Sequence, residues 1–414
     1  MKKAPSPFVS LMPIIVLVLL LFATIRTFGS DALSGGSQVS LLTTTAICIL
    51  IGMVFYKIPW KDYELAITNN IAGVATAIII LLIIGALSGI WMISGIVPTL
   101  IYYGMQIIHP SFFLASTCII CALISVMTGS SWTTIATIGI ALMGIGKAQG
   151  FEDGWIAGAI ISGAYFGDKI SPLSETTILA SSITDTPLFR HIRYMMITTV
   201  PSLVITLIIF TVAGFSHDAN NTQHIAEVAT ALNEKFHITP WLLIVPVATG
   251  ILIAKKVPSI VTLFLSTLLA AVFALIFQPD LLEEISGIAA SGFDSLFKGL
   301  MMTIYGETNL HTDNAVLTDL IATRGMSGMM NTIWLILCAM CFGGAMTASG
   351  MVGSITSIFV RFMKKTVSVV SATVCSGLFL NLTTADQYIS IILTGNMFRD
   401  IYAKKGYELS LIHI

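Results

Sequence analysis

The sequence predicts an all-α polytopic membrane protein, and three observations carry this prediction. Of the 414 residues, 56% are hydrophobic. Only 10% are charged, against about 25% in an average soluble domain. Apolar runs of roughly 20 residues, the length that a helix needs to cross a bilayer, recur along the whole chain. A soluble domain with this composition could not cover its surface with polar groups, whereas a lipid bilayer accepts an apolar exterior.

The apolar runs fall into two groups. The clear candidates for spans lie near 11–28, 39–56, 71–93, 111–127, 195–215, 241–254, 257–277, 332–349 and 366–382. Less apolar segments, rich in Gly, Ser and Thr, lie near 97–108, 131–146, 155–166, 286–305, 350–362 and 388–398. Short, interrupted segments of this kind are typical of broken or re-entrant helices.

The distribution of basic residues predicts the orientation, because cytoplasmic loops carry an excess of Lys and Arg. Lys2 and Lys3 precede the first span, which is too long for a signal peptide and is expected to stay uncleaved. The segment 216–237 is acidic, with Lys235 as its single Lys or Arg. We therefore expect a cytoplasmic N-terminus and an external loop at 216–237.

Small residues recur in the two halves of the chain at one offset, 255 residues. Ser94-Gly95 matches Ser349-Gly350 in this way, and Gly73 and Gly89 each have a glycine at the same offset. Chance is the alternative, since Gly and Ser are common in apolar helices. Paired breaks are typical of secondary transporters built from repeats. We predict two repeats, inverted relative to each other, with breaks at Gly95 and Gly350.

These patterns divide the chain into segments. They are N-terminal spans (1–62), a first transporter repeat (63–215), the external polar loop (216–237), linking spans (238–317), an incomplete second repeat (318–408) and a non-native tail (409–414). At the same offset, the partners of Asp168 and Glu175 would fall beyond Ile414. The last six residues look like a translated sequencing adapter, so we expect a C-terminally truncated chain.

The first polar cluster interrupts an apolar region at 128–134. Its sequence is TGSSWTT, with five hydroxyls in seven residues. Hydroxyls and carbonyls freed at a helix break could replace the water around Na⁺. The alternative is that these hydroxyls bond to carbonyls of their own helix. We predict a break at Gly129 and ion ligands at Thr128, Ser130 and Ser131.

The second polar cluster, 167–177, contains an acidic residue between apolar flanks. Gly167 permits a break, and Pro172 removes a backbone donor and interrupts the helix. The Asp168 carboxylate could hold Na⁺ or a proton but not readily both, which is the chemistry of an ion exchanger. Lys169 is expected as its charge partner. The alternative is a cytoplasmic loop with a solvated Asp168–Lys169 pair.

The third polar cluster, 381–388, is the offset partner of the first. Its candidate ligands are Thr383, Thr384 and Asp386. An acid between two apolar runs is a functional candidate, although Asp386 could instead cap the helix expected at 388–398. A fourth polar segment, 305–314, is interpreted as an exposed loop, with gating or ion access as the alternative.

Several classes of function are not supported by the sequence. The net charge is −1, so no global field favours nucleic acid. The six cysteines lie in apolar runs, where cysteine behaves as a small hydrophobe. There is no phosphate-binding loop for ATP, and no convincing catalytic pair of an intramembrane protease. We expect no enzyme activity and no cofactor. A channel or membrane-embedded enzyme is the alternative from another class.

Three motifs resemble the NhaC-type sodium/proton antiporters. They are GDKISPLSETT (167–177), GIVPTLIYYG (95–104) and ADQY (385–388), and the resemblance extends over nearly the whole chain. It implies Na⁺/H⁺ exchange in the bacterial cytoplasmic membrane, with Na⁺-coupled malate/lactate exchange as the alternative. The resemblance implies that Asp168, Ser171, Thr177 and Asp386 are functional residues, as in the family. The family more often has Asp where this chain has Glu175, which keeps a carboxylate.

The residues and the resemblance together give one hypothesis. Na⁺ and H⁺ compete at an intramembrane site containing Asp168, with Glu175 and the nearby hydroxyls, and Asp386 contributes from the second repeat. The two aspartates are the expected Na⁺ ligands. The partners implied are the lipid bilayer, Na⁺ and H⁺, without nucleic acid. Uniformly apolar helix faces are also compatible with a homodimer.

Overall fold

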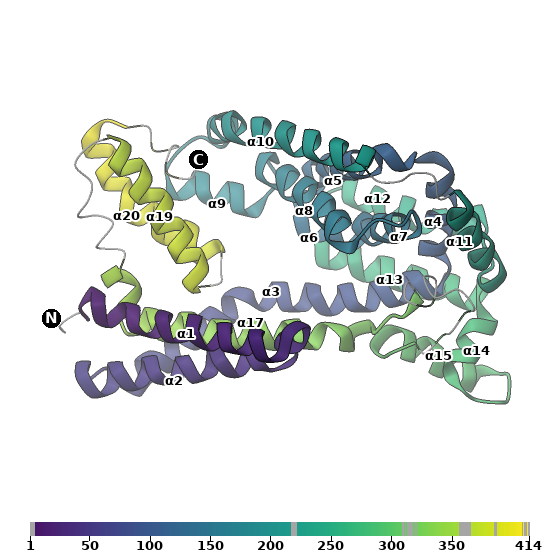
Figure 1. Cartoon of the computed structure of the whole chain (residues 1–414), viewed down its shortest axis with the longest axis horizontal. Helices are drawn as coiled ribbons and strands as arrows, with labels where there is room; N and C mark the ends of the chain where they lie inside the picture. The colour runs from purple at the N-terminus through teal and green to yellow at the C-terminus, as the bar shows by residue number, and fades with distance from the viewer. Residues whose placement is uncertain are drawn as a thin grey trace. The chain divides into compact units, whose positions relative to one another are not determined.

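The computed structural model describes residues 5–216, 222–308, 310, 312, 318, 321–355, 366–384, 387–407, 409 and 412. Within these residues every regular element is a helix (Figure 1). The chain forms two compact units. Unit 1 contains Met1–Ile78, Leu179–Arg190 and Met330–Ile414, and unit 2 contains Ile79–Ile178 and His191–Met329. The predicted all-α membrane class is confirmed.

Seven helical segments of the described chain are long and apolar enough to cross a bilayer. They are Pro7–Phe28, Gly36–Tyr56, Trp60–Ile93, Pro110–Thr128, Leu188–Ser216, Ser259–Phe277 and Gly325–Ala348. A further pair, Glu227–Lys235 and Pro240–Ala254, is bent by 91° and would make an eighth span if counted as one. Each of the seven falls on an apolar run of the sequence, because lipid selects for continuous apolar surface.

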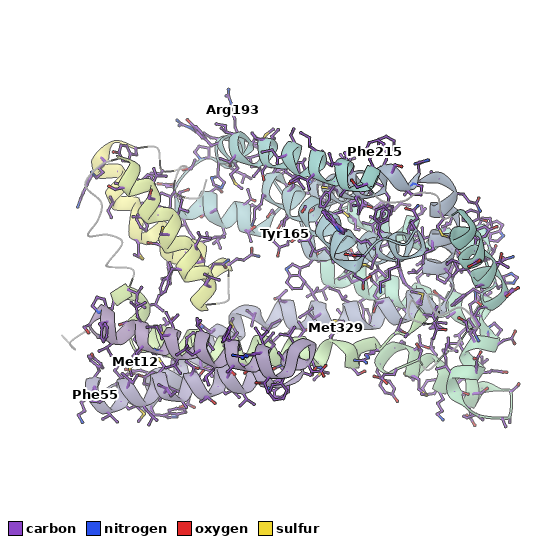
Figure 2. All side chains as sticks on the ribbon, viewed as in Figure 1. Met12, Phe55, Tyr165, Arg193, Phe215 and Met329 are labelled. Carbon is purple, nitrogen blue, oxygen red and sulfur yellow. The ribbon has the colours of Figure 1, made fainter. Side chains whose placement is uncertain are left out.

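Unit 1 is built around three helices that pack side by side (Figure 1): α1 (Pro7–Phe28), α2 (Gly36–Tyr56) and α17 (Met330–Ala348). The start of α3 (Trp60–Ile93) packs closely on α17, since a Cβ on Gly344 would meet the backbone of Ile67 at 2.7 Å. Outer side chains such as Met12 and Phe55 stay exposed (Figure 2), as expected for helices that face lipid. The remaining elements are η1 (Gly29–Ser34), the end of α9 (Glu175–Ile183), α19 (Thr366–Thr384) and α20 (Gln387–Lys405).

Unit 2 contains the two interrupted helix pairs that the sequence predicts. The first pair is α5 (Phe113–Thr128) and α6 (Ser131–Thr134), and the second is α8 (Asp153–Ile170) and the start of α9. Helix α5 packs along α8 (Figure 1). Glycines allow this approach, because a Cβ on Gly163 or Gly167 would collide with the backbone of Cys118 or Ala122. The close packing of α5 on α8 brings the two interruptions together.

The other elements of unit 2 surround these pairs. They are α4 (Ile96–Ile107), η2 (Pro110–Phe112), a π-helical turn η3 (Ile135–Gly139), α7 (Ile140–Ala148), most of α10 (Leu188–Ser216), α11 (Thr222–Lys235), η4 (Pro240–Leu243), α12 (Ile244–Ala254), α13 (Ser259–Phe277), α14 (Pro279–Ser286), α15 (Phe293–Tyr305) and η5 (Gly325–Met329). A buried polar chain crosses the core, in which the Trp91 indole donates to Ser266 Oγ at 3.2 Å and Ser266 bonds Thr249 at 2.8 Å. These bonds give partners to two hydroxyls and an indole N–H, and lipid tails could offer them none.

Two sequence predictions of local structure were wrong in part. The segment 286–305 is not one helix, because α14 ends at Ser286 and the chain turns at Gly287 (φ 63°) before α15 begins. The segment 216–237, expected as a loop, contains α11. Its apolar face buries Val228, Leu232 and, just beyond the helix, Phe236.

The two Ser-Gly breaks have the same local geometry. Gly95 and Gly350 have φ values of 82° and 71°, which few residues other than glycine adopt. Ser94 Oγ donates to the Trp91 carbonyl at 3.3 Å, and Ser349 Oγ donates to the carbonyl three residues before it at 2.9 Å. The breaks at Gly95 and Gly350 are thus present, while the repeats, the segment boundaries and the truncation stay predictions.

Candidate functional site

The first interruption is a short, capped break. Helix α5 ends at Thr128 and is capped by Gly129, whose φ of 67° turns the chain and whose N–H donates to the Ser125 carbonyl at 2.8 Å. Ser130 then caps α6, because its Oγ accepts from Thr133 N at 3.2 Å. A glycine at the helix end and a serine at the next helix start are the residues that such a break requires.

The second interruption lies between α8 and α9. Helix α8 ends at Ile170, and Pro172 lies in the turn that follows. Ser171 Oγ donates to the Val126 carbonyl at 2.8 Å and accepts from Leu173 N at 3.2 Å. The fully buried Ser171 hydroxyl therefore ties this turn to the last turns of α5.

Asp168 lies in the last turn of α8 and is 5% exposed. Ser131, the first residue of α6, donates its hydroxyl to Asp168 Oδ2 at 3.2 Å. Ser131 is itself 3% exposed. Because α5 packs along α8, the start of α6 lies beside the end of α8. The packing therefore joins one residue of the first predicted cluster to one residue of the second.

A third group of hydroxyls lies at the start of α9. Thr177 Oγ1 donates to the Lys169 carbonyl at 3.0 Å and lies 3.5 Å from that of Asp168. Lys169 Nζ donates to Thr176 Oγ1 at 3.3 Å. The Thr176 hydroxyl also bonds that of Ser174 at 3.1 Å. One hydrogen bond of Lys169 thus goes to a hydroxyl on α9, and its role as the charge partner of Asp168 stays a prediction.

Two of the predicted ligands bond to nearby backbone. Thr128 Oγ1 lies 3.1 Å from the Ser130 carbonyl and 3.3 Å from the Ser125 carbonyl. Ser130 Oγ accepts the hydrogen bond that caps α6. For Thr128 the bond to the Ser125 carbonyl matches the alternative interpretation, in which hydroxyls bond to carbonyls of their own helix, whereas the Ser130 oxygen accepts a capping bond. Ser131 is the member of this cluster whose hydroxyl contacts the carboxylate.

Sequence reasoning placed Thr133 and Thr134 in the first cluster but missed its polar continuation at Thr137. Thr133, Thr134 and Thr137 are each at most 5% exposed. Thr133 and Thr134 precede the π-helical turn Ile135–Gly139 and Thr137 lies within it; such turns often mark functional positions. Thr137 Oγ1 donates to the Thr133 carbonyl at 2.8 Å. Threonines at positions 133, 134 and 137 lie on one helix face, and this spacing was the available signal.

Some predicted site residues lie elsewhere or outside the described residues. Gly167 was expected at a break, but it lies inside α8 as a packing contact against Ala122 and Ser125. The side chains of Glu175, Thr383 and Thr384 and the whole of Asp386 lie outside the described part of the chain.

The donor set around Asp168 consists of oxygen atoms. The described side chains and backbone offer one carboxylate, buried hydroxyls and the carbonyls at two helix ends. Oxygen donors suit hard cations. Where the structure describes the chain, no group of three or more His, Cys, Asp or Glu side chains could hold a metal ion. Among the described residues, hydroxyl and carbonyl oxygens are therefore the further donors beside the Asp168 carboxylate.

The model of the Na⁺/H⁺ antiporter family matches residues 163–413. The Na(+)/H(+) antiporter NhaC of Bacillus subtilis (strain 168) is 35% identical, over 89% of this chain and 78% of its own length. The NhaC of Alkalihalophilus pseudofirmus is 36% identical, over 86% of this chain and 75% of its own.

A third relative carries a different name. The Malate-2H(+)/Na(+)-lactate antiporter of Bacillus subtilis (strain 168) is 36% identical, over 88% of this chain and 75% of its own length. The apolar helices and these relatives together show that the chain is a multi-pass bacterial membrane protein. The chain belongs to the Na⁺/H⁺ antiporter family, and within that family it is of the NhaC type.

Proposed function

We propose that this chain is a secondary transporter that exchanges Na⁺ for H⁺ across the bacterial cytoplasmic membrane, with both ions competing for the Asp168 carboxylate. The relatives named Na⁺/H⁺ antiporter support the exchange. The observation that carries the competition is the 3.2 Å hydrogen bond from Ser131 to Asp168 Oδ2. It places a buried acid beside a neutral oxygen, so that one small site serves either ion.

Competition follows from the charge of the site. Na⁺ needs the carboxylate ionised, because burying an unpaired cation is costly. A proton neutralises the same carboxylate and removes the attraction for Na⁺. The Ser131 oxygen keeps lone pairs free for Na⁺ while its proton points to Asp168. The buried Thr177 hydroxyl bonds the Lys169 carbonyl and holds the end of α8 beside the start of α9.

The transport cycle would move this site between the two sides of the membrane. In the proposed cycle the two predicted repeats rock against each other around the helix breaks, with Asp386 and its neighbouring threonines contributing from the second repeat. The N-terminus would lie in the cytoplasm. The membrane potential supplies about 2.3 kcal/mol per charge per 100 mV, so it drives the exchange only if the two directions move unequal charge.

The test is proton movement in liposomes that contain the full chain. The fluorescence of a pH-sensitive dye is followed after Na⁺ is added to liposomes that contain the Asp168→Asn variant. The Asp153→Asn variant is the matched control. Asp153 is 67% exposed in its ion pair with Lys147. We expect Asp168→Asn to abolish Na⁺-dependent proton movement and Asp153→Asn to keep it. Near-normal exchange in Asp168→Asn would refute the role of Asp168.

Na⁺-coupled exchange of organic acids is the second candidate. It is supported by the malate/lactate relative and by Lys169, whose ammonium lies 3.3 Å from Thr176 beside the site. An ammonium and a helix start could hold a carboxylate. Proton movement that requires malate or lactate in addition to Na⁺, and that is lost in Lys169→Met, would favour this candidate over simple exchange.

A further inference from the structure

Three sulfur atoms and a hydroxyl meet at the Ser349-Gly350 break in unit 1. Cys48 on α2 lies with its Sγ 3.7 Å from Met346 Sδ and 3.6 Å from Met351 Sδ. Its distance to Ser349 Oγ is 3.7 Å. The three sulfur-bearing side chains are fully buried, and Ser349 is 2% exposed. The two methionines flank the break, one on each side.

A single thiol proton does not account for this arrangement. The Cys48 thiol has one S–H to donate, yet two thioethers and a hydroxyl lie within 3.7 Å of its sulfur. The break itself does not require sulfur, because the corresponding Ser94-Gly95 break has Trp91 and Ile96 where this one has Met346 and Met351. The sulfur atoms are therefore particular to the second break.

The spacing suits a metal ion. A bond of about 2.3 Å from metal to sulfur places three ligands of a trigonal site about 4 Å apart. The observed separations of 3.7 and 3.6 Å from Cys48 are close to this value. Thiolate and thioether sulfur are the ligands preferred by soft cations such as Cu(I). One cation would satisfy all three sulfur atoms at once.

A buried tyrosine hydroxyl lies in the same core as the sulfur atoms. Tyr63 belongs to the same buried core as Cys48 and is fully buried. Its hydroxyl lies against Gly52, one turn along α2 from Cys48, where a Cβ would overlap it. This hydroxyl has no hydrogen-bond partner within the described residues. A buried polar group without a partner is costly, and a hydrated or ligand-bearing site beside it would remove that cost.

We propose that Cys48, Met346 and Met351 form a binding site for a soft monovalent cation of the Cu(I) and Ag(I) class, with the Ser349 hydroxyl beside it. On binding, the Cys48 thiol releases its proton to solvent and its sulfur supplies the electron pair of the new bond, while the oxidation state of the metal stays unchanged. Binding therefore strengthens as pH rises. The bound cation would tie α2 to both sides of the break.

The experiment is a titration of the purified full chain with Ag⁺ in chloride-free detergent buffer. The other cysteines (Cys118, Cys121, Cys338, Cys341 and Cys375) are replaced by alanine, so that Cys48 is the remaining thiol. We expect one tight equivalent of Ag⁺, with release of one proton, and its loss in Cys48→Ala. Met346→Leu and Met351→Leu should each weaken binding at least tenfold. Met340→Leu is the matched control, since Met340 is buried in the same helix as Met346. This variant should leave the affinity unchanged.

Two outcomes would overturn the proposal. One is a tight equivalent that survives Cys48→Ala. The other is equal affinity in Met346→Leu, Met351→Leu and Met340→Leu, which would reduce the cluster to sulfur packing. X-ray absorption of the chain in which Cys48 is the remaining thiol, with one equivalent of Ag⁺, gives an answer without any methionine variant. It should show three sulfur neighbours around the metal, of which one thiol can supply only one, and a shell with a single sulfur, or with nitrogen and oxygen alone, would contradict the site.

Discussion

Gly129 and Leu173 touch across the two helix breaks of unit 2. A Cβ built on Gly129 would lie 2.7 Å from the backbone and from the Cβ of Leu173. Gly129 also has a φ of 67°, in the left-handed region. The α5–α6 break and the α8–α9 turn thus meet where backbone approaches backbone, and this contact sets the position of Ser131 relative to Asp168.

Gly129→Ala should therefore be damaging. The left-handed conformation costs an L-residue about 1–2 kcal/mol, and the overlap with Leu173 backbone adds to it. We expect the free energy of unfolding to fall by about 1–3 kcal/mol and Na⁺-dependent proton movement to be lost. The measurements are unfolding of the detergent-solubilised chain and exchange in liposomes.

Gly154→Ala is the matched control for Gly129→Ala. A Cβ at Gly154 meets no atom within 4 Å, and the residue lies in the first turn of α8. We expect its stability to be unchanged or to rise by up to about 1 kcal/mol, because alanine favours a helix over glycine. Equal behaviour of the two variants would contradict the importance of the Gly129–Leu173 contact.

The spans could be predicted from the sequence because lipid imposes apolar length directly. The contacts of the site could not. Asp168 and Ser131 are distant in sequence, and their 3.2 Å bond arises from α5 packing on α8. The function of Gly167 was misassigned because a glycine that permits a bend and one that permits close packing look alike in sequence. Helix α11 was missed, although Val228, Leu232 and Phe236 recur at a helical spacing.

Ser131→Ala should weaken Na⁺ binding while leaving the fold intact. The variant removes a hydroxyl oxygen and a hydrogen bond to a carboxylate, a bond worth about 1.5–3 kcal/mol. We expect the Na⁺ concentration for half-maximal exchange to rise roughly tenfold or more. Thr206→Ala is the control, since Thr206 bonds its own helix backbone on α10. An unchanged half-saturation in Ser131→Ala would remove Ser131 from the site.

The pH dependence should show competition between the two ions. Na⁺ binds the ionised Asp168 carboxylate, and a proton at the same oxygen prevents it. In the pH range where the carboxyl is mainly protonated, each unit of rising pH should lower the half-saturating Na⁺ concentration about tenfold. Where the carboxyl is ionised, the half-saturation should become independent of pH. Initial rates over a grid of pH and Na⁺ give this result, and a change in maximal rate with constant half-saturation would exclude one shared site.

Gln278 should stabilise unit 2 without taking part in exchange. Its amide accepts from His237 N at 3.2 Å and donates to the His237 carbonyl at 3.1 Å, so that it satisfies both backbone groups of one residue. Gln278→Leu leaves both groups without a partner, at about 1–3 kcal/mol for each one that stays buried. We expect a lower free energy of unfolding, with Na⁺ half-saturation unchanged because neither residue contacts Asp168 in the described hydrogen bonds.

Gln278→Glu separates the two bonds to His237. Glutamate keeps an oxygen that accepts from His237 N–H, but it cannot donate to the carbonyl when ionised. Its loss of stability should therefore depend on pH. The introduced carboxyl regains a donor when it is protonated, so the loss should be smaller at low pH and larger once the carboxyl is ionised. Gln278→Leu has no such group, and the pH dependence of its unfolding should follow that of the unsubstituted chain. If the leucine and glutamate variants lost the same stability at every pH, the bond to the His237 carbonyl would carry no separate contribution.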